Sequence, residues 1–507
     1  MIKVIIIKVK LKIYITLLLV CAFSAANAQL TINPGGFITI GQTGSMYVGT
    51  SLHINSNASG SGYWVDKTSG NDVIITGSVD VERYLAQGGW HNTAAPVNNT
   101  SSSLFTGTDL VFYYDETIIL NDWNFGWVWY SGLLEAMRGY DVYIASPLTV
   151  DYTSSSGNDL NTGSYTIPVT RTNVSNGESE SHKGWNLIGN PYPSPVDWLE
   201  EPGWDKSDIN DAKYIWSPTN NNYTIFLGGS NPTGLNGGTQ YIPSNQGFWV
   251  QAITTGTVGI NNACRTGTMS ATPDYYKKSD QLFSGLRITA SGNGYSDETM
   301  VRFLPTATAN FDINKDASKL FSPFDSIPQI CTLAAKQQLA VNSLPDVIED
   351  LRVNMDFYCN AEGTYTLSIA DSSEFLRGNQ VYLMDIRKQK MINLNKKQRY
   401  TFYHNPEFSP HRFTLFFNPS GDFIDSLNPD SRFTVSTNGN TITIERNTQK
   451  FYQAGITIYN MMGQLTGTYI ISNDTKTTFS IQVPRGYYIV SIKTSGHLSN
   501  IKVFLSG

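Results

Sequence analysis

Short runs of alternating apolar and polar residues, each ended by Gly, Asn or Pro, follow one another along most of this chain and are its strongest structural constraint. A period of two is typical of strands with one buried face, and strands roughly 7 to 12 residues apart leave no room for long helices. The chain is therefore predicted to be all-β. At 507 residues it is too long for one core, so several domains are expected.

Two regions show the pattern clearly. Residues 29–85 contain very short strands, predicted at 37–40, 45–48, 52–54, 63–65, 73–76 and 79–84. Their spacing suits either a small β-solenoid or the edge of a sandwich. Residues 276–420 contain seven longer strands, predicted at 286–289, 300–303, 351–357, 365–369, 381–385, 400–403 and 413–417. Their alternation favours a β-sandwich or a jelly roll.

Three sequence blocks near the C-terminus stand in a fixed order. Residues 458–464 are IYNMMGQ, residues 483–492 are VPRGYYIVSI, and residues 502–505 are KVFL. Together they resemble the C-terminal sorting domain of Bacteroidetes proteins that are exported by the type IX secretion system. The resemblance implies that residues 430–507 fold as an Ig-like β-sandwich, for which about seven short strands are available.

The same resemblance implies partners for this domain. In that family the domain is recognised by the type IX secretion machinery, and a surface peptidase often removes it and attaches the remainder to lipopolysaccharide. The residues that match the family's sorting signal are Tyr459, Gly463, Gln464, Gly486, Tyr488, Val490 and Lys502. The glycines are expected in tight turns, the tyrosines in the sheet, and Lys502 on an edge strand.

The N-terminus predicts export as well. Four lysines within residues 1–12 precede an apolar stretch at 13–23, and Ala26, Asn27 and Ala28 form a small-residue cleavage site. Residues 1–28 are therefore predicted to be a signal peptide, with Gln29 starting the mature chain. A membrane anchor is the alternative, but the apolar stretch is about half of the roughly 20 residues that a span needs. The expected location is the outer cell surface or the medium.

Composition sets limits on the partners. Charged residues make up 15% of the chain, below the roughly 25% of an average soluble protein. Residues 1–28 hold four Lys and no acid, so the net charge of −6 becomes −10 without them. Because binding to phosphates requires a basic face, no nucleic acid is expected as a partner.

Residues 86–275 hold nine of the ten tryptophans and form a predicted Trp-rich β domain. Residues 184–198, GWNLIGNPYPSPVDW, and 246–252, QGFWVQA, resemble the middle region of the same surface proteins. Trp123, Trp127 and Trp129 lie two apart and would share one face of a strand. A covered face would make them core, whereas an open face would make them candidate glycan contacts.

Three cysteines and one acidic loop remain to be assigned. The mature chain keeps Cys264, Cys331 and Cys359, for which either a Cys331–Cys359 disulfide or three buried thiols is expected. Asp312, Asn314 and Asp316 have the spacing that opens a calcium loop, but Ala317 replaces the required Gly. A solvated turn is therefore expected there, and no metal site is predicted.

Signatures of catalysis are missing from the sequence. It contains no H-E-x-x-H, no G-x-S-x-G and no phosphate-binding Gly-rich loop, so neither a cofactor nor an enzyme is expected. Three hypotheses follow. The first is a non-catalytic surface protein with a structural or adhesive role, the second a carbohydrate-binding surface protein, and the third a hydrolase whose pair of acids is distant in sequence.

Overall fold

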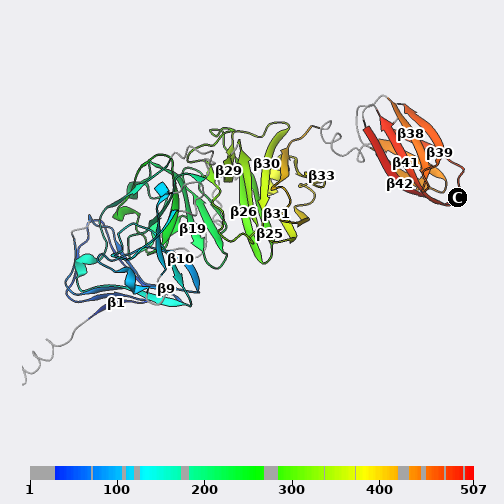
Figure 1. Ribbon diagram of the computed structural model, residues 1–507. Coiled ribbons are helices and arrows are strands. Elements are labelled where there is room, and N and C mark those ends of the chain that lie inside the picture. Colours follow the sequence, from blue (N-terminus) through cyan, green and yellow to red (C-terminus); the bar gives the residue numbers. More distant parts are fainter. Residues whose placement is uncertain are drawn as a thin grey trace, which may run out of the picture.

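The computed structural model is built almost entirely from strands, which confirms the all-β, multidomain prediction (Figure 1). It describes residues 29–69, 72–105, 110–118, 126–172, 182–267, 284–335, 337–370, 373–420, 433–446, 453–472, 475–494 and 497–506. The predicted signal peptide and most of the predicted linker before the last domain lie outside these ranges. None of the helices in the described ranges has the length and apolar character that a membrane span requires.

The N-terminal region is a short β-solenoid. Three parallel ladders form its faces, made of β1 (Leu30–Ile32), β4 (Leu52–Ile54) and β9 (Val79–Leu85); β2 (Phe37–Ile40) and β7 (Tyr63–Asp66); and β3 (Met46–Val48) and β8 (Val73–Ile75). Paired residues are 22 to 27 positions apart, so each coil uses about that much chain. Of the two predicted alternatives for residues 29–85, the solenoid is the one that forms.

The solenoid continues into the next region without a break in its core. Strand β14 (Leu148–Ser154) pairs antiparallel with β9 and extends its sheet. A small hairpin, β5 (Ser56–Asn57) and β6 (Gly60–Ser61), lies beside it. The buried side chains of Ile32, Ile54 and Val81 belong to the same cluster as Val142 and Tyr152. The solenoid therefore supports the strands that follow it.

The Trp-rich region contains two main sheets. The first has the order β10 (Gly89–Thr93), β13 (Tyr140–Ile144), β11 (Val111–Tyr114) and β12 (Trp127–Trp129). The second has the order β16 (Trp185–Gly189), β23 (Gly247–Ala252), β19 (Ile209–Ser217), β20 (Asn222–Leu227) and β21 (Thr233–Leu235). Smaller sheets join β15 (Tyr165–Val169), β24 (Gly256–Ile260) and β18 (Trp204–Asp205), and β17 (Val196–Asp197) and β22 (Tyr241–Ile242).

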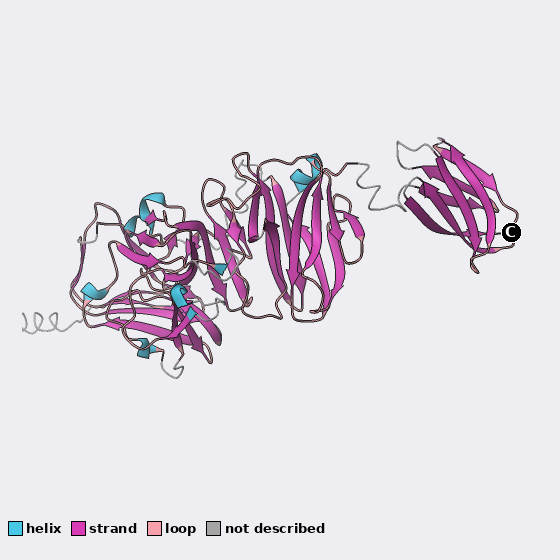
Figure 2. Cartoon of the chain, turned by 45° about the horizontal axis from the view of Figure 1, so that its top comes forward, coloured by secondary structure: helices cyan, strands magenta, loops and turns pink. Residues whose placement is uncertain are grey.

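Short 3-10 helices connect these strands (Figure 2). They are η1 (Ser102–Leu104), η2 (Glu116–Ile118), η4 (Gly157–Asp159), η6 (Glu201–Gly203) and η7 (Asn262–Cys264). Just after η7, the buried guanidinium of Arg265 donates to the carbonyl of Trp64 at 2.6 Å and to Ser194 Oγ at 3.1 Å. Arg265 therefore ties the solenoid to the Trp-rich region.

Residues 285–417 form one long sheet. Its order is β33 (Lys390–Asn393), β32 (Val381–Asp385), β35 (His411–Phe417), β30 (Leu351–Tyr358), β28 (Gln329–Ala334), β29 (Gln337–Leu344), β26 (Tyr295–Phe303), β25 (Gly285–Gly292), β31 (Gly363–Ala370) and β34 (Arg399–His404), with β27 (Ala317–Ser318) beside β29 and α2 (Ser373–Gly378) after β31. Leu383 of β32 and Phe402 of β34 share one core although they lie near opposite ends of the sheet. The sheet therefore curls around its own core. The sequence predicted seven of its eleven strands.

The curled sheet packs against the five-stranded sheet of the Trp-rich region. Tyr214 and Leu227 share a buried cluster with Met300 and Val341. Beside it, the fully buried ammonium of Lys319 forms an ion pair with Asp297 Oδ2 at 2.5 Å. The apolar contact fixes the position of the strands that form the site described below, and the ion pair lies within the curled-sheet region beside it.

The C-terminal region is a seven-stranded sandwich with its own core (Figure 1). One sheet contains β36 (Phe433–Asn438), β37 (Thr441–Arg446) and β40 (Lys476–Ser480). The other contains β39 (Leu465–Ser472), β38 (Gln453–Asn460), β41 (Gly486–Thr494) and β42 (His497–Leu505). Both the number of strands and the two-sheet arrangement agree with the predicted Ig-like sandwich.

The favoured Cys331–Cys359 disulfide is wrong. Cys264, Cys331 and Cys359 are all free and buried. Cys331 pairs with Asp356 across β28 and β30, so Cys359 lies three positions further along the neighbouring strand. Three residues of strand span about 10 Å, beyond the roughly 7 Å between Cα atoms that a disulfide allows. The alternative of three buried thiols is the correct one.

Candidate functional site

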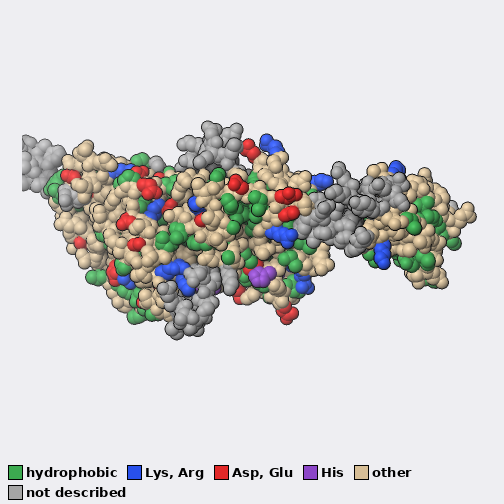
Figure 3. Space-filling model, turned by 90° about the horizontal axis from the view of Figure 1, so that it is seen from above, with side chains coloured by type: hydrophobic (Ala, Val, Ile, Leu, Met, Phe, Trp, Pro, Cys, Tyr) green, Lys and Arg blue, Asp and Glu red, His purple; other side chains and the backbone are tan. Residues whose placement is uncertain are grey.

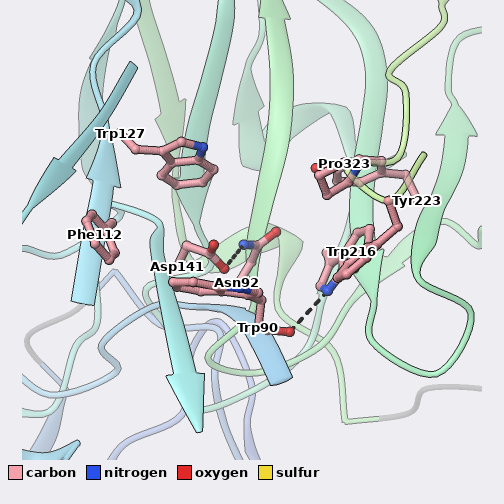
Figure 4. Close-up of a pocket in the computed structure, with 9 residues that line it drawn as sticks. Trp90, Asn92, Phe112, Trp127, Asp141, Trp216, Tyr223 and Pro323 are labelled. Atoms are coloured by element: carbon pink, nitrogen blue, oxygen red, sulfur yellow. Dashed lines mark hydrogen bonds between the residues drawn. The ribbon is translucent and has the colours of Figure 1, made fainter. Parts of the chain in front are cut away.

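A cleft of about 400 Å³ opens between the four-stranded and five-stranded sheets of the Trp-rich region (Figure 4). Most of its wall is aromatic, and two polar side chains lie among the rings. Its lining consists of Trp90 and Asn92 on β10, Phe112 on β11, Trp127 on β12, Asp141 on β13, Trp216 on β19, Tyr223 on β20, and Pro323 and Phe324. We call it the aromatic cleft.

Strand pairing explains why these residues meet. Trp90 and Asn92 are two positions apart on β10, so both point to the same face of the sheet. Asn92 is paired with Asp141 on β13, and Asp141 is paired with Phe112 on β11. Trp216 comes from the other sheet, and its Nε1 donates to the carbonyl oxygen of Trp90 at 3.0 Å. This bond joins the two sheets at the wall of the cleft.

The rings are held by contacts with one another. Trp90 meets Phe112 edge to face with centroids 5.9 Å apart, and Trp216 stacks on Phe324 at the same distance. Trp127 packs edge to face against the buried Trp249 at 5.5 Å. Rings fixed in this way present flat apolar faces, and their side chains lose little conformational entropy when a ligand binds.

The polar side chains at the base of the cleft are only partly satisfied. Asn92 Nδ2 donates to Asp141 Oδ1 at 2.8 Å, and Asn92 Oδ1 has no hydrogen-bond partner among the described residues. Burial raises the pKa of Asp141 well above its usual range, although the hydrogen bond from Asn92 opposes this shift. The carboxyl group of Asp141 lines the cleft and can exchange hydrogen bonds with hydroxyl groups, so the base suits a ligand that carries them.

The structure separates the three predicted glycan contacts. Trp127 lines the aromatic cleft. Trp129 lies on the same face of β12, opposite Phe112 on the paired strand, and is 59% exposed. Trp123 lies outside the described residues. The sequence pattern therefore pointed to one wall of the cleft, and it missed Trp90, Phe112, Asn92 and Asp141, which only the strand register brings together.

Trp185, Trp216 and Trp249 are all buried. Trp216 differs from the other two because one side of its ring forms part of the cleft wall. No feature of its sequence neighbourhood distinguishes it from a core tryptophan. Its role depends on the contact between two sheets that are far apart in sequence.

The seven predicted sorting residues lie in or beside the four-stranded sheet of the C-terminal sandwich. Tyr459 is near the end of β38, and Gly463 has a φ of 78° in the turn that follows. Gln464 Oε1 accepts a hydrogen bond from Asn460 Nδ2 at 2.8 Å across that turn. The Gly463 turn therefore has the geometry that the sequence predicted.

The other four residues lie on β41 and β42. Gly486 starts β41 opposite Leu505, which places it in a strand rather than in a tight turn. Tyr488 and Val490 are buried, and the Tyr488 hydroxyl donates to the carbonyl of Pro484 at 2.8 Å. Lys502 lies on the outermost strand, with its ammonium 4.2 Å from the centre of the Tyr487 ring.

The acidic loop at residues 312–316 is structural. Asp316 Oδ1 accepts from the backbone of Ser343 at 2.6 Å, and Asn314 Oδ1 accepts from the backbone of Asp211 at 3.0 Å. Burial raises the pKa of Asp316 to about 6. No group of His, Cys, Asp and Glu side chains among the described residues is arranged to hold a metal ion. These side-chain oxygens accept hydrogen bonds from backbone amides.

Comparison with known proteins gives a family but no function. The family model described as "Domain of unknown function (DUF8693)" matches residues 3–417, so the chain belongs to this family. The match ends at the last residue of β35 and does not include the C-terminal sandwich. No curated protein matches the chain.

Solved structures resemble it only distantly. A two-domain fibronectin type III segment from chicken tenascin aligns at 8% identity, with a TM-score of 0.13, over 31% of this chain and 94% of its own. Dimeric latent PorU from Porphyromonas gingivalis aligns at 8% identity and a TM-score of 0.14 over 72% of this chain and 35% of its own. The BSP domain of a biofilm-associated protein aligns at 7% identity and a TM-score of 0.13, over 84% of this chain and 92% of its own.

Proposed function

We propose that this protein is a non-catalytic, glycan-binding protein of the outer cell surface or the surrounding medium, with an adhesive role. In this proposal residues 29–420 form the binding part. The C-terminal sandwich is the sorting signal that the type IX secretion machinery recognises when it exports the protein. The aromatic cleft is the observation that carries the binding half of the proposal.

The chemistry of the cleft suits a sugar. The apolar faces of a pyranose ring pack against aromatic side chains, and its hydroxyl groups need hydrogen-bond partners at the ring edge. The walls supply the rings of Trp90, Trp127 and Trp216, and the base supplies Asn92 and Asp141. The carboxyl group of Asp141 also lines the cleft and would exchange hydrogen bonds with a ligand hydroxyl, whereas Asn92 Oδ1 is buried without a partner among the described residues.

A cationic ligand is the main competitor for a site made of rings and a carboxyl group. Burial raises the pKa of Asp141 and so favours its neutral form. A neutral carboxyl attracts a cation weakly but still exchanges hydrogen bonds with hydroxyl groups. This difference favours a glycan.

A glycan array tests the binding proposal. We expect the mature chain to bind a defined subset of glycans, and Trp127→Ala to weaken that binding at least about tenfold, or about 1.4 kcal/mol. Tyr47→Ala is the matched control, because Tyr47 is a 69% exposed aromatic residue on β3 and is not among the residues that line the cleft. Absence of binding, or equal binding by both variants, would contradict the proposal.

A hydrolase is the second candidate, and Asp141 is the observation that favours it. A carboxyl group with a raised pKa in an apolar cleft resembles the general acid of a glycoside hydrolase. That reaction requires a second carboxylate within about 5 to 10 Å, and Asp141 is the one acid among the described residues that line the cleft. Release of reducing ends from a bound oligosaccharide, lost in Asp141→Asn, would favour the enzyme.

The export half of the proposal rests on the C-terminal residue blocks and on the independent core of that sandwich. Deleting residues 430–507 should leave the protein in the periplasm, whereas the full chain should reach the surface or the medium. Normal export of the shortened chain would rule out a sorting role. If the remainder is attached to lipopolysaccharide, the surface form should migrate as a broad, heavier species.

A further inference from the structure

A second, smaller pocket adjoins the aromatic cleft. It has a volume of about 190 Å³ and shares Asn92 and Trp216 with the cleft. Its remaining lining comes from the end of β9, from β10 and from two loops: Arg83, Tyr84, Leu85, Ala86, Gln87, His91, Thr93, Pro218, Thr219, Asn245 and Gln246. We call it the arginine pocket.

Arg83 occupies an unusual position on β9. Val81 and Leu85, two positions to either side, are buried core residues, so alternation places Arg83 on the core-facing side of the strand. A charged side chain on that side normally has bonded partners. Neither a hydrogen bond nor an ion pair of the Arg83 guanidinium is found within the part of the chain that the structure describes.

Two buried arginines show the bonding that accompanies a structural role in this protein, whereas Arg83 is only partly buried. Arg302 donates to Ser343, Asn231 and Lys315, and Arg412 donates to Tyr403 and Asp385. Arg83 lines an open pocket instead. Burial lowers its pKa, and the hydroxyls of Tyr63 and Tyr152 oppose that shift. Among the described residues, no carboxylate is a cause of the shift, so no ion pair compensates this charge.

The rest of the pocket adds a donor and no negative charge. Asn245 is 2% exposed, and its Nδ2 has no hydrogen-bond partner among the described residues. His91 Nε2 is 2.8 Å from the carbonyl oxygen of Gln87, and burial lowers the pKa of this imidazole. No Asp or Glu belongs to the described lining of this pocket. An anion entering it would meet the Arg83 guanidinium without a competing acid in the described lining.

We propose that the arginine pocket binds the carboxylate or sulfate of an acidic sugar, while the neighbouring sugar of the same glycan occupies the aromatic cleft. This inference rests on the proposed glycan function and extends it to acidic oligosaccharides. Arginine suits either anion because its planar guanidinium can donate two parallel hydrogen bonds. The pocket is smaller than the roughly 300 to 1,000 Å³ of sites for drug-sized ligands, so it takes one sugar unit or its acidic group.

Calorimetric titration of the mature chain with matched probes tests this inference. One pair is an oligogalacturonide and its methyl ester, and the other is a chondroitin sulfate oligosaccharide and its desulfated form. In at least one pair we expect the form with the extra negative group to bind at least about tenfold more tightly, as for a charge-assisted hydrogen bond. Arg83→Gln should reduce the affinity for the probe with the extra negative group to the affinity for the matched probe without it. Arg399→Gln, on an exposed site of β34, is the matched control and should preserve the difference.

Equal affinity within both pairs, including no binding of any probe, would overturn the acidic-sugar inference. The glycan proposal would then still be judged by Trp127→Ala on the array, so the two failures can be distinguished. Thermal unfolding of Arg83→Gln shows whether the substitution impairs folding. Because Arg83 has no bonded partner among the described residues, Arg83→Gln should unfold at the same or a higher temperature, and a clear fall would assign it a structural role and overturn the inference.

Discussion

Asn92 and Asp141 face each other across β10 and β13, with Asn92 Nδ2 2.8 Å from Asp141 Oδ1. This pair places a carboxyl group among the rings of the aromatic cleft, where burial raises the pKa of Asp141. The folded state therefore binds this proton more tightly than the unfolded state. The resulting stability is present below the ordinary pKa of 3.8 and is lost as the pH rises through the raised value.

Asp141→Asn should therefore stabilise the protein at pH 8 and have little effect near pH 4. Each unit by which the pKa is raised corresponds to about 1.4 kcal/mol at the higher pH. Urea unfolding of wild type and variant at both pH values measures the difference. Asp346→Asn is the control, because Asp346 is exposed in the loop between β29 and β30. A variant that is less stable than wild type at pH 8 would contradict this account.

Removing Lys319 should destabilise the curled sheet at the buried ion pair beside the Trp-rich region. Lys319→Met leaves Asp297 buried and charged, although Asn222 and Asn236 still donate to it at 3.0 and 2.9 Å. Breaking a buried pair in this way costs about 3 to 5 kcal/mol. Urea unfolding of residues 29–420 should show this loss. A change below about 1 kcal/mol would mean that the pair is poorly formed.

The three cysteines should behave as buried thiols. Native mature protein should react slowly with a thiol reagent, and the protein unfolded in guanidinium should expose three thiols without a reductant. Burial strongly raises the pKa of Cys264 and Cys331, which slows their reaction further. Release of a single thiol from unfolded, unreduced protein would indicate a disulfide and contradict the structure.

The turn at Gly463 should depend on glycine. Gly463 has a φ of 78°, a conformation that other L-residues adopt with strain, so Gly463→Ala should destabilise the C-terminal sandwich by about 1 kcal/mol. Gly455→Ala on β38 is the matched control, because Gly455 lacks a positive φ and a Cβ there makes no close contact. Thermal unfolding of residues 430–507 compares the two variants. Equal effects would contradict this explanation.

The sequence predicts strands better than it predicts their partners. Alternation located most short strands of the solenoid, but it left solenoid and sandwich open because parallel partners lie 22 to 27 residues apart. The same limit explains the wrong disulfide, since only the register of β28 and β30 shows that Cys331 and Cys359 are offset. At the candidate site, Trp127 was found from its local spacing. Asp141 was missed because its partner Asn92 is 49 residues away.

A crystal structure of the mature chain with an oligosaccharide selected on the array would show whether the aromatic cleft binds glycans. We expect a sugar ring in the aromatic cleft, packed against Trp90, Trp127 or Trp216 and hydrogen-bonded to the Asn92 and Asp141 side chains. A ligand bound elsewhere on the chain with the cleft left empty would contradict this expectation.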